Sequence, residues 1–404
     1  MRRFLPLSLA LLSLPLAAQP QPGDWIVSDS SPALGAIFYM TPGGGPVPSL
    51  YTGRPTGFFN GVMMARDNTD LAALFAGGPR HVVHVTPTGL VTTVGPIGTT
   101  PSGNGPNAID QDQDGNYLVT TDVGNGLYRV DPVNSVSTSL MSIPGPGTVN
   151  AAAIDQENGD LLYGTSFGGL FRMHRTTQAI TSITGFSGSV AAIDFEPRTG
   201  QYIVVSQGSP SVTRRVSRTG VGTMLTTTPY FANAVKVDDE TGNLLIAGGN
   251  AIAHVTPAGG VITSLGGLPF NATGVETHGS RKVTGFGPAT AGSSYTVLFA
   301  FPRSANQVYY AAMSTGLRPG VALPDGRTIN LDITSPLFPI SIGGLPGITL
   351  GFSGFLNSGG QATGTIAIPP SFPAGIRIFV SALALNPFLP LGLDTANTIG
   401  FTTN

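Results

Sequence analysis

Short apolar runs alternate with polar turns along most of the chain, and three patterns recur in step. The first pattern is a tight turn: two strand residues, often Thr-Pro or Asp-Pro, then glycine or asparagine before a run of Val, Thr and Ser. Proline and glycine at these positions favour a turn between two strands. Its copies, whose last residues are spaced 39 to 45 apart, are Tyr39–Pro42, His84–Pro87, Arg129–Pro132, Arg172–Arg175, Arg215–Arg218 and His254–Pro257.

The other two patterns are strands. One is a β-rich run, with copies at Trp25–Val27, Leu71–Leu74, Tyr117–Val119, Leu161–Tyr163, Tyr202–Val204 and Leu244–Ile246. The other is rich in small residues and comes just before it, at Val62–Met64, Ala108–Asp110, Ala153–Asp155, Ala192–Asp194, Val235–Val237 and Gly274–Glu276. Small side chains fit where several sheets crowd around an axis, so this strand is predicted to be innermost.

The repeat predicts an all-β chain with a six-bladed β-propeller over residues 22–287. Four-stranded sheets repeated about every 43 residues around an axis are typical of that fold. The small-residue strand starts and ends one unit late, so the strand around Val275 is expected to complete the blade that Trp25 begins. An open stack of hairpins is the alternative.

The repeat stops near Pro288, where a second domain is predicted over residues 288–404. Gly285–Ser294 has the composition of a linker. Alternating runs follow at Thr296–Ala300, Thr328–Ile333, Thr365–Ile368 and Arg377–Val380. Proline and glycine turns separate them, which favours a small antiparallel β-sandwich.

The first 18 residues have the pattern of a secretory signal peptide. Arg2 and Arg3 precede the apolar run Phe4–Leu16, and two small residues follow it, with cleavage expected near Ala18. A membrane anchor is the alternative, but the run is too short to cross about 30 Å of hydrocarbon. A secreted, extracellular or cell-envelope bacterial protein is expected, without a membrane span after cleavage.

Charge and composition limit the classes of partner that the chain could bind. The chain has 404 residues, 19 Lys and Arg against 21 Asp and Glu, and no cysteine. Nucleic acid is excluded as a partner because its binding needs clustered positive charge. Only two lysines and four glutamates occur, which argues against surface helices. We expect a monomer that binds an unknown polar ligand or an extracellular protein or polysaccharide.

A family resemblance lies in the repeat. Gly105–Asp110, Asp114–Val119 and Gly126–Pro132 resemble the repeat of NHL-type propellers, and the gluconolactonase and regucalcin-like six-bladed propellers look similar. The resemblance covers about residues 22–287, and it implies the fold more than an activity. Lactonase-like propellers hold a metal with a Glu, two Asn and an Asp near the axis. Here Glu276 is the only glutamate in an inner strand, and it lies at the strand's far end.

Asparagine precedes the inner strand in five of the six units, and Gly188-Ser189 takes the remaining place. If these amides face the channel they could bind a polar ligand or a metal, and they are the candidate ligand-binding residues. The alternative is that asparagine serves the turn that enters each blade. The five are Asn60, Asn107, Asn150, Asn233 and Asn271.

Asp110, Asp112, Asp114 and Gly115 form the first half of a calcium-loop pattern. Alternating carboxylates can converge on one cation, while glycine permits the sharp turn. The position where an EF-hand has its last acid is Thr121, and the equivalent turns of other units are acidic too. A calcium site and a solvated Asp/Gly turn are therefore both open.

No constellation points clearly to catalysis. Gly164–Gly168 matches a nucleophile elbow, but that motif works on a strand-to-helix turn. The histidines are scattered, and His84 and His254 fall at equivalent repeat positions, so the repeat explains them better than zinc does. The sequence favours a binding or scaffold protein, with a metal-dependent lactonase-like, hydrolase-like or lyase-like propeller enzyme as the alternative.

Overall fold

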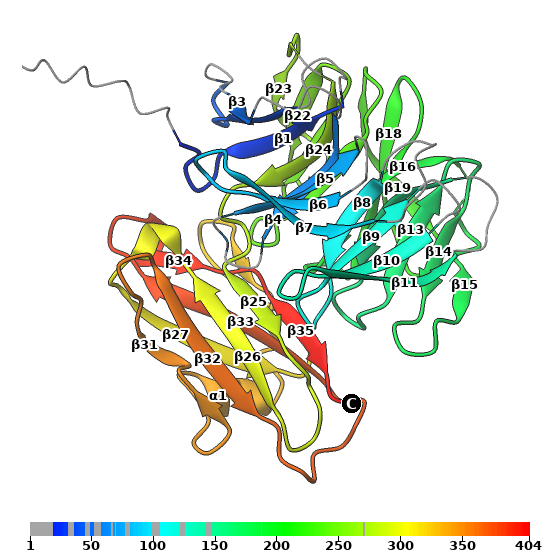
Figure 1. Ribbon diagram of the computed structural model, residues 1–404. Coiled ribbons are helices and arrows are strands. Elements are labelled where there is room, and N and C mark those ends of the chain that lie inside the picture. The colour runs from blue at the N-terminus through cyan, green and yellow to red at the C-terminus, as the bar shows by residue number, and fades with distance from the viewer. Residues whose placement is uncertain are drawn as a thin grey trace, which may run out of the picture.

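The computed structural model describes residues 19–30, 36–44, 49–51, 58–65, 68, 70–76, 81–97, 106–121, 126–142, 148–186, 188–269 and 271–404. The predicted signal peptide, residues 1–18, lies outside this part of the chain. Two assemblies of antiparallel sheets lie side by side (Figure 1). We call residues 25–277 the sheet ring and residues 283–402 the C-terminal unit.

Within the described residues, the sheet ring contains six four-stranded antiparallel sheets. In five of them the strands follow one another along the chain, from the inner strand outward. These are β4 (Phe58–Met64), β5 (Leu71–Ala76), β6 (His81–Val85) and β7 (Val91–Pro96); β8 (Pro106–Gln111), β9 (Tyr117–Thr121), β10 (Gly126–Asp131) and β11 (Val136–Ser142); β12 (Val149–Ile154), β13 (Leu161–Thr165), β14 (Leu170–Met173) and β15 (Ile180–Ser182); β16 (Val190–Glu196), β17 (Gln201–Ser206), β18 (Ser211–Val216) and β19 (Gly222–Thr228); and β20 (Ala234–Val237), β21 (Leu244–Gly248), β22 (Ala251–Val255) and β23 (Val261–Leu265).

The remaining sheet joins distant parts of the chain. Its strands are β1 (Trp25–Asp29), β2 (Ile37–Met40) and β3 (Ser49–Tyr51), and its inner strand is β24 (Ala272–Thr277). Val27 of β1 lies opposite Val275 of β24, which is the pairing that the offset of the repeat predicts. The inner strands contact one another in sequence, β4–β8–β12–β16–β20–β24, and β24 contacts β4 again.

Burial explains the repeating patterns. The second strands are the most deeply buried, because neighbouring sheets cover both of their faces; all five residues of β9, β13 and β21 are buried. Small residues in the inner strands allow close approach at the axis: a Cβ on Gly274 would lie 2.9 Å from the Val62 nitrogen. Each predicted tight turn lies between the third and fourth strands of its sheet.

The C-terminal unit consists mainly of two larger sheets whose facing side chains share one core. The first sheet has the order β25 (Val283–Phe286), β26 (Ser294–Ala300), β32 (Gln361–Ala367), β30 (Thr349–Leu350). The second has the order β31 (Ser353–Phe355), β27 (Val308–Ser314), β33 (Arg377–Leu385), β34 (Leu393–Thr395), and β35 (Ile399–Thr402) also pairs with β33. Val297 and Phe299 of the first sheet and Tyr309 and Val380 of the second belong to the shared core.

Two details of the C-terminal unit differ from the sequence prediction. Gly285–Ser294, expected as a linker, contains the end of β25 and the turn into β26, because small residues suit a hairpin turn as well as a linker. The run Thr328–Ile333 forms only the two-residue strand β29 (Thr328–Ile329), which pairs with β28 (Val321–Ala322). The short helix α1 (Leu337–Ser341) packs on β27. Among the described residues, no helix has the length and apolar character needed to cross a membrane.

A buried asparagine helps to hold the segment between the two assemblies in place. Asn68, in the turn after β4, donates from Nδ2 to the backbone oxygens of Gly279 (3.2 Å) and Ala300 (3.1 Å). Its Oδ1 accepts a hydrogen bond from the Arg281 nitrogen at 2.8 Å. Phe379 of the C-terminal unit also joins an apolar core of the sheet ring. The C-terminal unit is therefore docked on the sheet ring.

Candidate functional site

The two ends of the inner strands carry different polar side chains. The strands begin near the asparagines that the sequence singled out, which we call the amide end. They finish near acidic residues and the turns that follow, which we call the acid end. The structure brings the acid end, and not the amide end, against the C-terminal unit.

At the acid end, carboxylates connect neighbouring inner strands. Asp110 of β8 accepts a hydrogen bond from the Ile154 nitrogen of β12 through Oδ2, at 2.8 Å. Asp194 of β16 accepts one from the Val237 nitrogen of β20, also at 2.8 Å. A carboxylate that accepts from an adjacent strand satisfies a backbone N–H that the sheet itself leaves free. These acids therefore join one sheet to the next.

At the amide end, asparagines make the corresponding connection. Asn150 donates from Nδ2 to the Val190 oxygen at 3.3 Å, and Asn233 donates to the Ala272 oxygen at 3.0 Å. Asn271 donates to Ser30 Oγ at 2.8 Å. Asn60 and Asn107 lie in β4 and β8, but their side chains fall outside the described part. The described amides thus bond to the chain itself, and their ligand-binding role stays a prediction.

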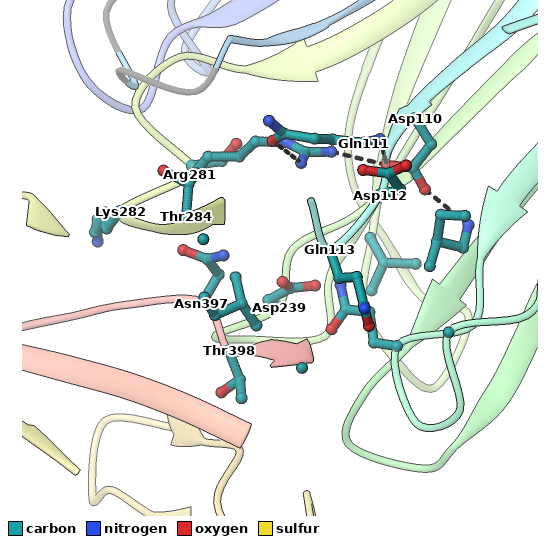
Figure 2. A pocket seen from close by; sticks show the side chains of 18 of the residues that line it. Asp110, Gln111, Asp112, Gln113, Asp239, Arg281, Lys282, Thr284, Asn397 and Thr398 are labelled. Atoms are coloured by element: carbon teal, nitrogen blue, oxygen red, sulfur yellow. Dashed lines mark hydrogen bonds and ion pairs between the residues drawn. The ribbon is translucent and has the colours of Figure 1, made fainter. Parts of the chain in front are cut away.

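Arg281 lies at the acid end and contacts two residues of β8. Its Nη2 lies 2.9 Å from Asp110 Oδ1, and its Nη1 donates to Gln111 Oε1 at 3.2 Å. Nearby, Lys236 Nζ lies 3.7 Å from both Asp194 and Glu276. Figure 2 shows Arg281 reaching across to Asp110 and Gln111. A residue of the connecting segment therefore supplies positive charge to a ring of inner-strand acids.

A cavity of about 690 Å³ opens between the acid end and the C-terminal unit; we call it the seam cavity. In Figure 2, Gln113 and Asp239 come from the turns of the sheet ring, and Asn397 and Thr398 come from the C-terminal unit. Its volume is in the range of small-molecule sites in proteins.

Many charged side chains line the seam cavity. The basic residues that line it are Arg129, Arg175, Lys236, Arg281, Lys282, Arg303, Arg327 and Arg377. The acidic residues are Asp110, Asp112, Asp114, Asp238, Asp239, Glu240, Glu276 and Asp394. Only 10% of the chain is charged, so the seam cavity gathers a large share of its charge. Both lysines of the chain are among these residues.

Some of these charges are used to dock the two assemblies. Lys282 Nζ lies 2.6 Å from Glu240 Oε1 and 2.8 Å from Asp394 Oδ1. Arg318 of the C-terminal unit pairs with Glu157 in the turn after β12. Tyr295 donates its hydroxyl to the Gln113 oxygen at 2.6 Å. The acidic turns of the repeat therefore form the surface on which the C-terminal unit sits.

Burial shifts the pKa of several groups in the wall. It raises the pKa of the Asp239 carboxyl to about 7, although Lys236 acts in the opposite direction. It raises the pKa of Asp112 to about 6, against the attraction of Arg129. Burial and the like charge of Arg175 lower the pKa of Arg377 to about 10. Each shift reflects a charge that has lost more hydration than its neighbours replace.

The predicted calcium residues are spread over different contacts. Asp112 Oδ1 accepts from the nitrogens of Asp114 and Asn116, each at 2.9 Å, and its Oδ2 lies 2.9 Å from Arg129 Nε. Asp110 bonds to Arg281 and Ile154. In the described residues, no group of three His, Cys, Asp or Glu side chains is placed to hold a metal ion. Calcium at this turn stays a prediction.

The seam cavity is the feature that sequence reasoning missed. Part of its wall comes from the C-terminal unit, and no periodicity predicts which face of the ring that unit covers. A signal was present: acidic turns recur at one end of the repeat, and the second domain carries four arginines against three aspartates. Complementary charge on the two parts could have suggested their contact.

Comparisons with known proteins place the fold. No family model and no curated protein matches the sequence. A nidogen/laminin complex structure is similar at 12% identity over 63% of this chain and 98% of that chain, with a TM-score of 0.52. TolB from Acinetobacter baumannii is similar at 15% identity over 64% and 68%, with a TM-score of 0.51. A gluconolactonase from Xanthomonas campestris matches at 10% identity over 70% and 94%, with a TM-score of 0.48.

At such low identities these likenesses concern the fold and no activity. The proteins are β-propellers. With its four-stranded antiparallel sheets, the chain described here is an all-β protein with a β-propeller fold.

Proposed function

We propose that this chain is a secreted binding or scaffold protein, in which a six-bladed β-propeller and a C-terminal β-sandwich hold a small polar ligand in the seam cavity. The six sheets of the ring and the pairing of β24 with β1 support the propeller. The shared core of the two C-terminal sheets supports the sandwich. We place the domain boundary between Thr277 and Val283, because β25 already pairs with β26. The signal-peptide pattern supports export.

One observation carries the proposed site: the seam cavity is both open and charged. Docking two domains requires complementary surfaces, and apolar packing through Phe379 already contributes to that. An open space of about 690 Å³ lined by basic and acidic groups is not required for docking. Charged groups are seldom withdrawn from water without a partner. Several charged groups of the wall are paired within the chain, and a polar ligand that fills the space would supply partners to others.

The position and the protonation of Asp239 suit it to binding a ligand. It lines the seam cavity, and its backbone oxygen accepts a hydrogen bond from Asn330 Nδ2 at 2.7 Å, which fixes the turn. Its carboxyl has a pKa raised to about 7, so it changes between donor and acceptor near neutral pH. A hydroxyl or amine of a ligand would bind such a group directly. Binding, rather than catalysis, is the simplest use of this geometry.

The test is a thermal-shift and calorimetric screen of the full chain against small sugars, amino acids, carboxylates and phosphates. We expect at least one class to raise the melting temperature of the wild type and to bind with one-to-one stoichiometry. Asp239→Asn should change that affinity. Asp332→Asn, the same substitution at an acid that lies outside the seam cavity and accepts hydrogen bonds from Thr334, is the matched control and should not. Failure of every class to bind would contradict the proposed site.

The same preparation tests the lactonase-like alternative. Metal analysis of the purified protein is combined with a screen for lactone and phosphoester hydrolysis. Stoichiometric bound metal with turnover that is abolished by Asn150→Ala or Asn233→Ala would replace the binding proposal with an enzymatic one. Turnover that is lost in Asp239→Asn instead would place the chemistry in the seam cavity.

A further inference from the structure

Two arginines in the wall of the seam cavity come from different assemblies and approach the same point. Arg175 lies in the turn after β14 of the sheet ring, and Arg377 is the first residue of β33 in the C-terminal unit. Both side chains lie close to Gly159. A Cβ at that glycine would lie 2.9 Å from Arg175 Cδ and 2.9 Å from Arg377 Nη1.

The two guanidinium groups are held by neutral partners. Arg175 donates from Nη1 to Gln113 Oε1 at 2.8 Å, and the same oxygen accepts from the Thr402 nitrogen at 2.9 Å. Arg377 donates from Nη1 to Thr402 Oγ1 at 3.0 Å and from Nη2 to the Gln156 oxygen at 2.6 Å. These bonds fix the orientation of both side chains without neutralising either charge.

Among the described residues, no carboxylate forms an ion pair with Arg175 or Arg377. Two of the nearby acids are already engaged: Asp155 lies 2.8 Å from Arg218, and Asp160 pairs with Arg172 at 3.6 Å. Asp114 is the third, and it attracts Arg175 from beyond ion-pair distance. The two positive charges of Arg175 and Arg377 therefore have one nearby carboxylate, that of Asp114, that forms no ion pair among the described residues.

Two neighbouring guanidinium groups with no anion between them reduce the stability of the folded chain. Like charges that are partly withdrawn from water destabilise each other, and here each lies in a domain that docking brings to the other. The pKa of both guanidinium groups is lowered, for Arg377 partly by Arg175 itself. An oxyanion placed between two guanidinium groups can accept several charge-assisted hydrogen bonds and remove the repulsion.

We propose that Arg175 and Arg377 form an anion subsite in the seam cavity, which binds the carboxylate or phosphate group of the polar ligand. The inference rests on the proposed function, since it names the chemistry of one end of that ligand. One guanidinium belongs to each domain, so the bound anion also connects the propeller to the sandwich. Asp114 opposes anion binding and tunes its strength.

The test is isothermal titration calorimetry of the full chain with inorganic phosphate and with succinate, which separate the two sources of oxyanion. Glucose and ethylenediamine are the neutral and cationic comparisons. We expect at least one of the two anions to bind at low salt, more tightly than either comparison. Arg175→Gln should weaken that binding at least tenfold, and Asp114→Asn should strengthen it several-fold. Arg175→Lys should keep part of the affinity because it keeps the charge but not the fork of donors.

Each variant is checked for folding by its melting temperature without ligand. Arg175 is the main target because Arg377 makes more structural bonds, so the Arg377→Lys variant serves only as a second measurement. Anion binding that is unchanged by Arg175→Gln would overturn the subsite. Binding of glucose or ethylenediamine alone would also overturn it while leaving the proposed function intact. A chain that binds none of the four probes, nor any ligand class of the wider screen, contradicts both.

Discussion

Side chains connect neighbouring inner strands at both ends of these strands, with amides at one end and carboxylates at the other. Asn150 and Asn233 connect neighbouring strands at the amide end through neutral hydrogen bonds. Asp110 and Asp194 do so at the acid end through charged ones. A neutral bridge leaves no charge to compensate. A charged bridge attracts counter-charges, and here these are Arg281 and Lys236.

This difference explains why the C-terminal unit covers one end and not the other. The acid end carries the acidic turns. Arg318 of the C-terminal unit pairs with Glu157 in one of them, and Lys282 of the connecting segment lies between Glu240 of the sheet ring and Asp394 of the C-terminal unit. The same charges, where docking leaves a gap, make the wall of the seam cavity. Under the proposed function, the polar bridges at the acid end are thereby part of the ligand-binding site.

The largest effect is expected from opening the ring, on which both ends depend. A chain that stops at Pro269 lacks β24, the inner strand of the first sheet, as well as the C-terminal unit. We expect it to lose several kcal/mol, comparable to the total stability of a domain, which is about 5–15 kcal/mol. Urea unfolding measures this loss. A chain that stops at Lys282 keeps β24 and is the control; equal stability of the two chains would contradict closure by β24.

The next prediction compares the two ends directly. Asp194→Ala removes a half-buried carboxylate from the Val237 nitrogen and from Lys236, so it should cost about 2 kcal/mol. Asn233→Ala removes one neutral hydrogen bond and should cost about 1 kcal/mol. Urea unfolding of both variants near pH 7 gives the difference. Equal costs would mean that charge does not distinguish the two ends.

A smaller effect is expected from the pH dependence of the acid end. The pKa of Asp239 is raised to about 7 in the folded chain, so between about pH 4 and pH 7 the folded state binds more protons than the unfolded state. Stability should therefore fall as pH rises through this window. Asp239→Asn should flatten this slope and raise stability at pH 8 by about 1–2 kcal/mol, less than the full shift because water screens part of the charge.

Urea unfolding at pH 5 and pH 8 checks this prediction. Asp332→Asn is the control, because Asp332 lies outside the seam cavity and bonds to Thr334. Asp112, whose pKa is raised to about 6, contributes a slope of the same sign that should remain in the Asp239 variant. A wild type whose stability rises between pH 5 and pH 8 would contradict the assignment.

The smallest effect is expected from calcium. If Asp110, Asp112 and Asp114 bound the ion, calcium at 100 times its Kd would stabilise the fold by about 2.7 kcal/mol. Arg281 and Arg129 already contact Asp110 and Asp112, so we expect the melting temperature to change little between millimolar calcium and a chelator. A calcium-dependent rise that disappears in Asp112→Ala would instead establish the site and make the acid end a metal-binding end.

Much of the sheet ring could be predicted from the sequence because its interactions are local and repeated. The tight turns, such as Thr86-Pro87, and the buried second strands, such as Tyr117–Val119, each recur with a fixed spacing. The offset of the small-residue strand also predicted the pairing of Val275 with Val27. The C-terminal unit was harder because its strands do not repeat, and the run at Thr328 gave only a two-residue strand.

The site depended on information that periodicity does not contain. The sequence by itself determined the strands, their order in each repeat, and the placing of asparagines and acids at opposite ends of the inner strands. Only the tertiary structure decided that Arg281 reaches Asp110, that Arg175 and Arg377 meet beside Gly159, and that a cavity remains between them. The physical reason is distance along the chain: hydrogen bonding and burial within a hairpin depend on neighbouring residues, whereas Arg175 and Arg377 come together only where the C-terminal unit docks on the sheet ring.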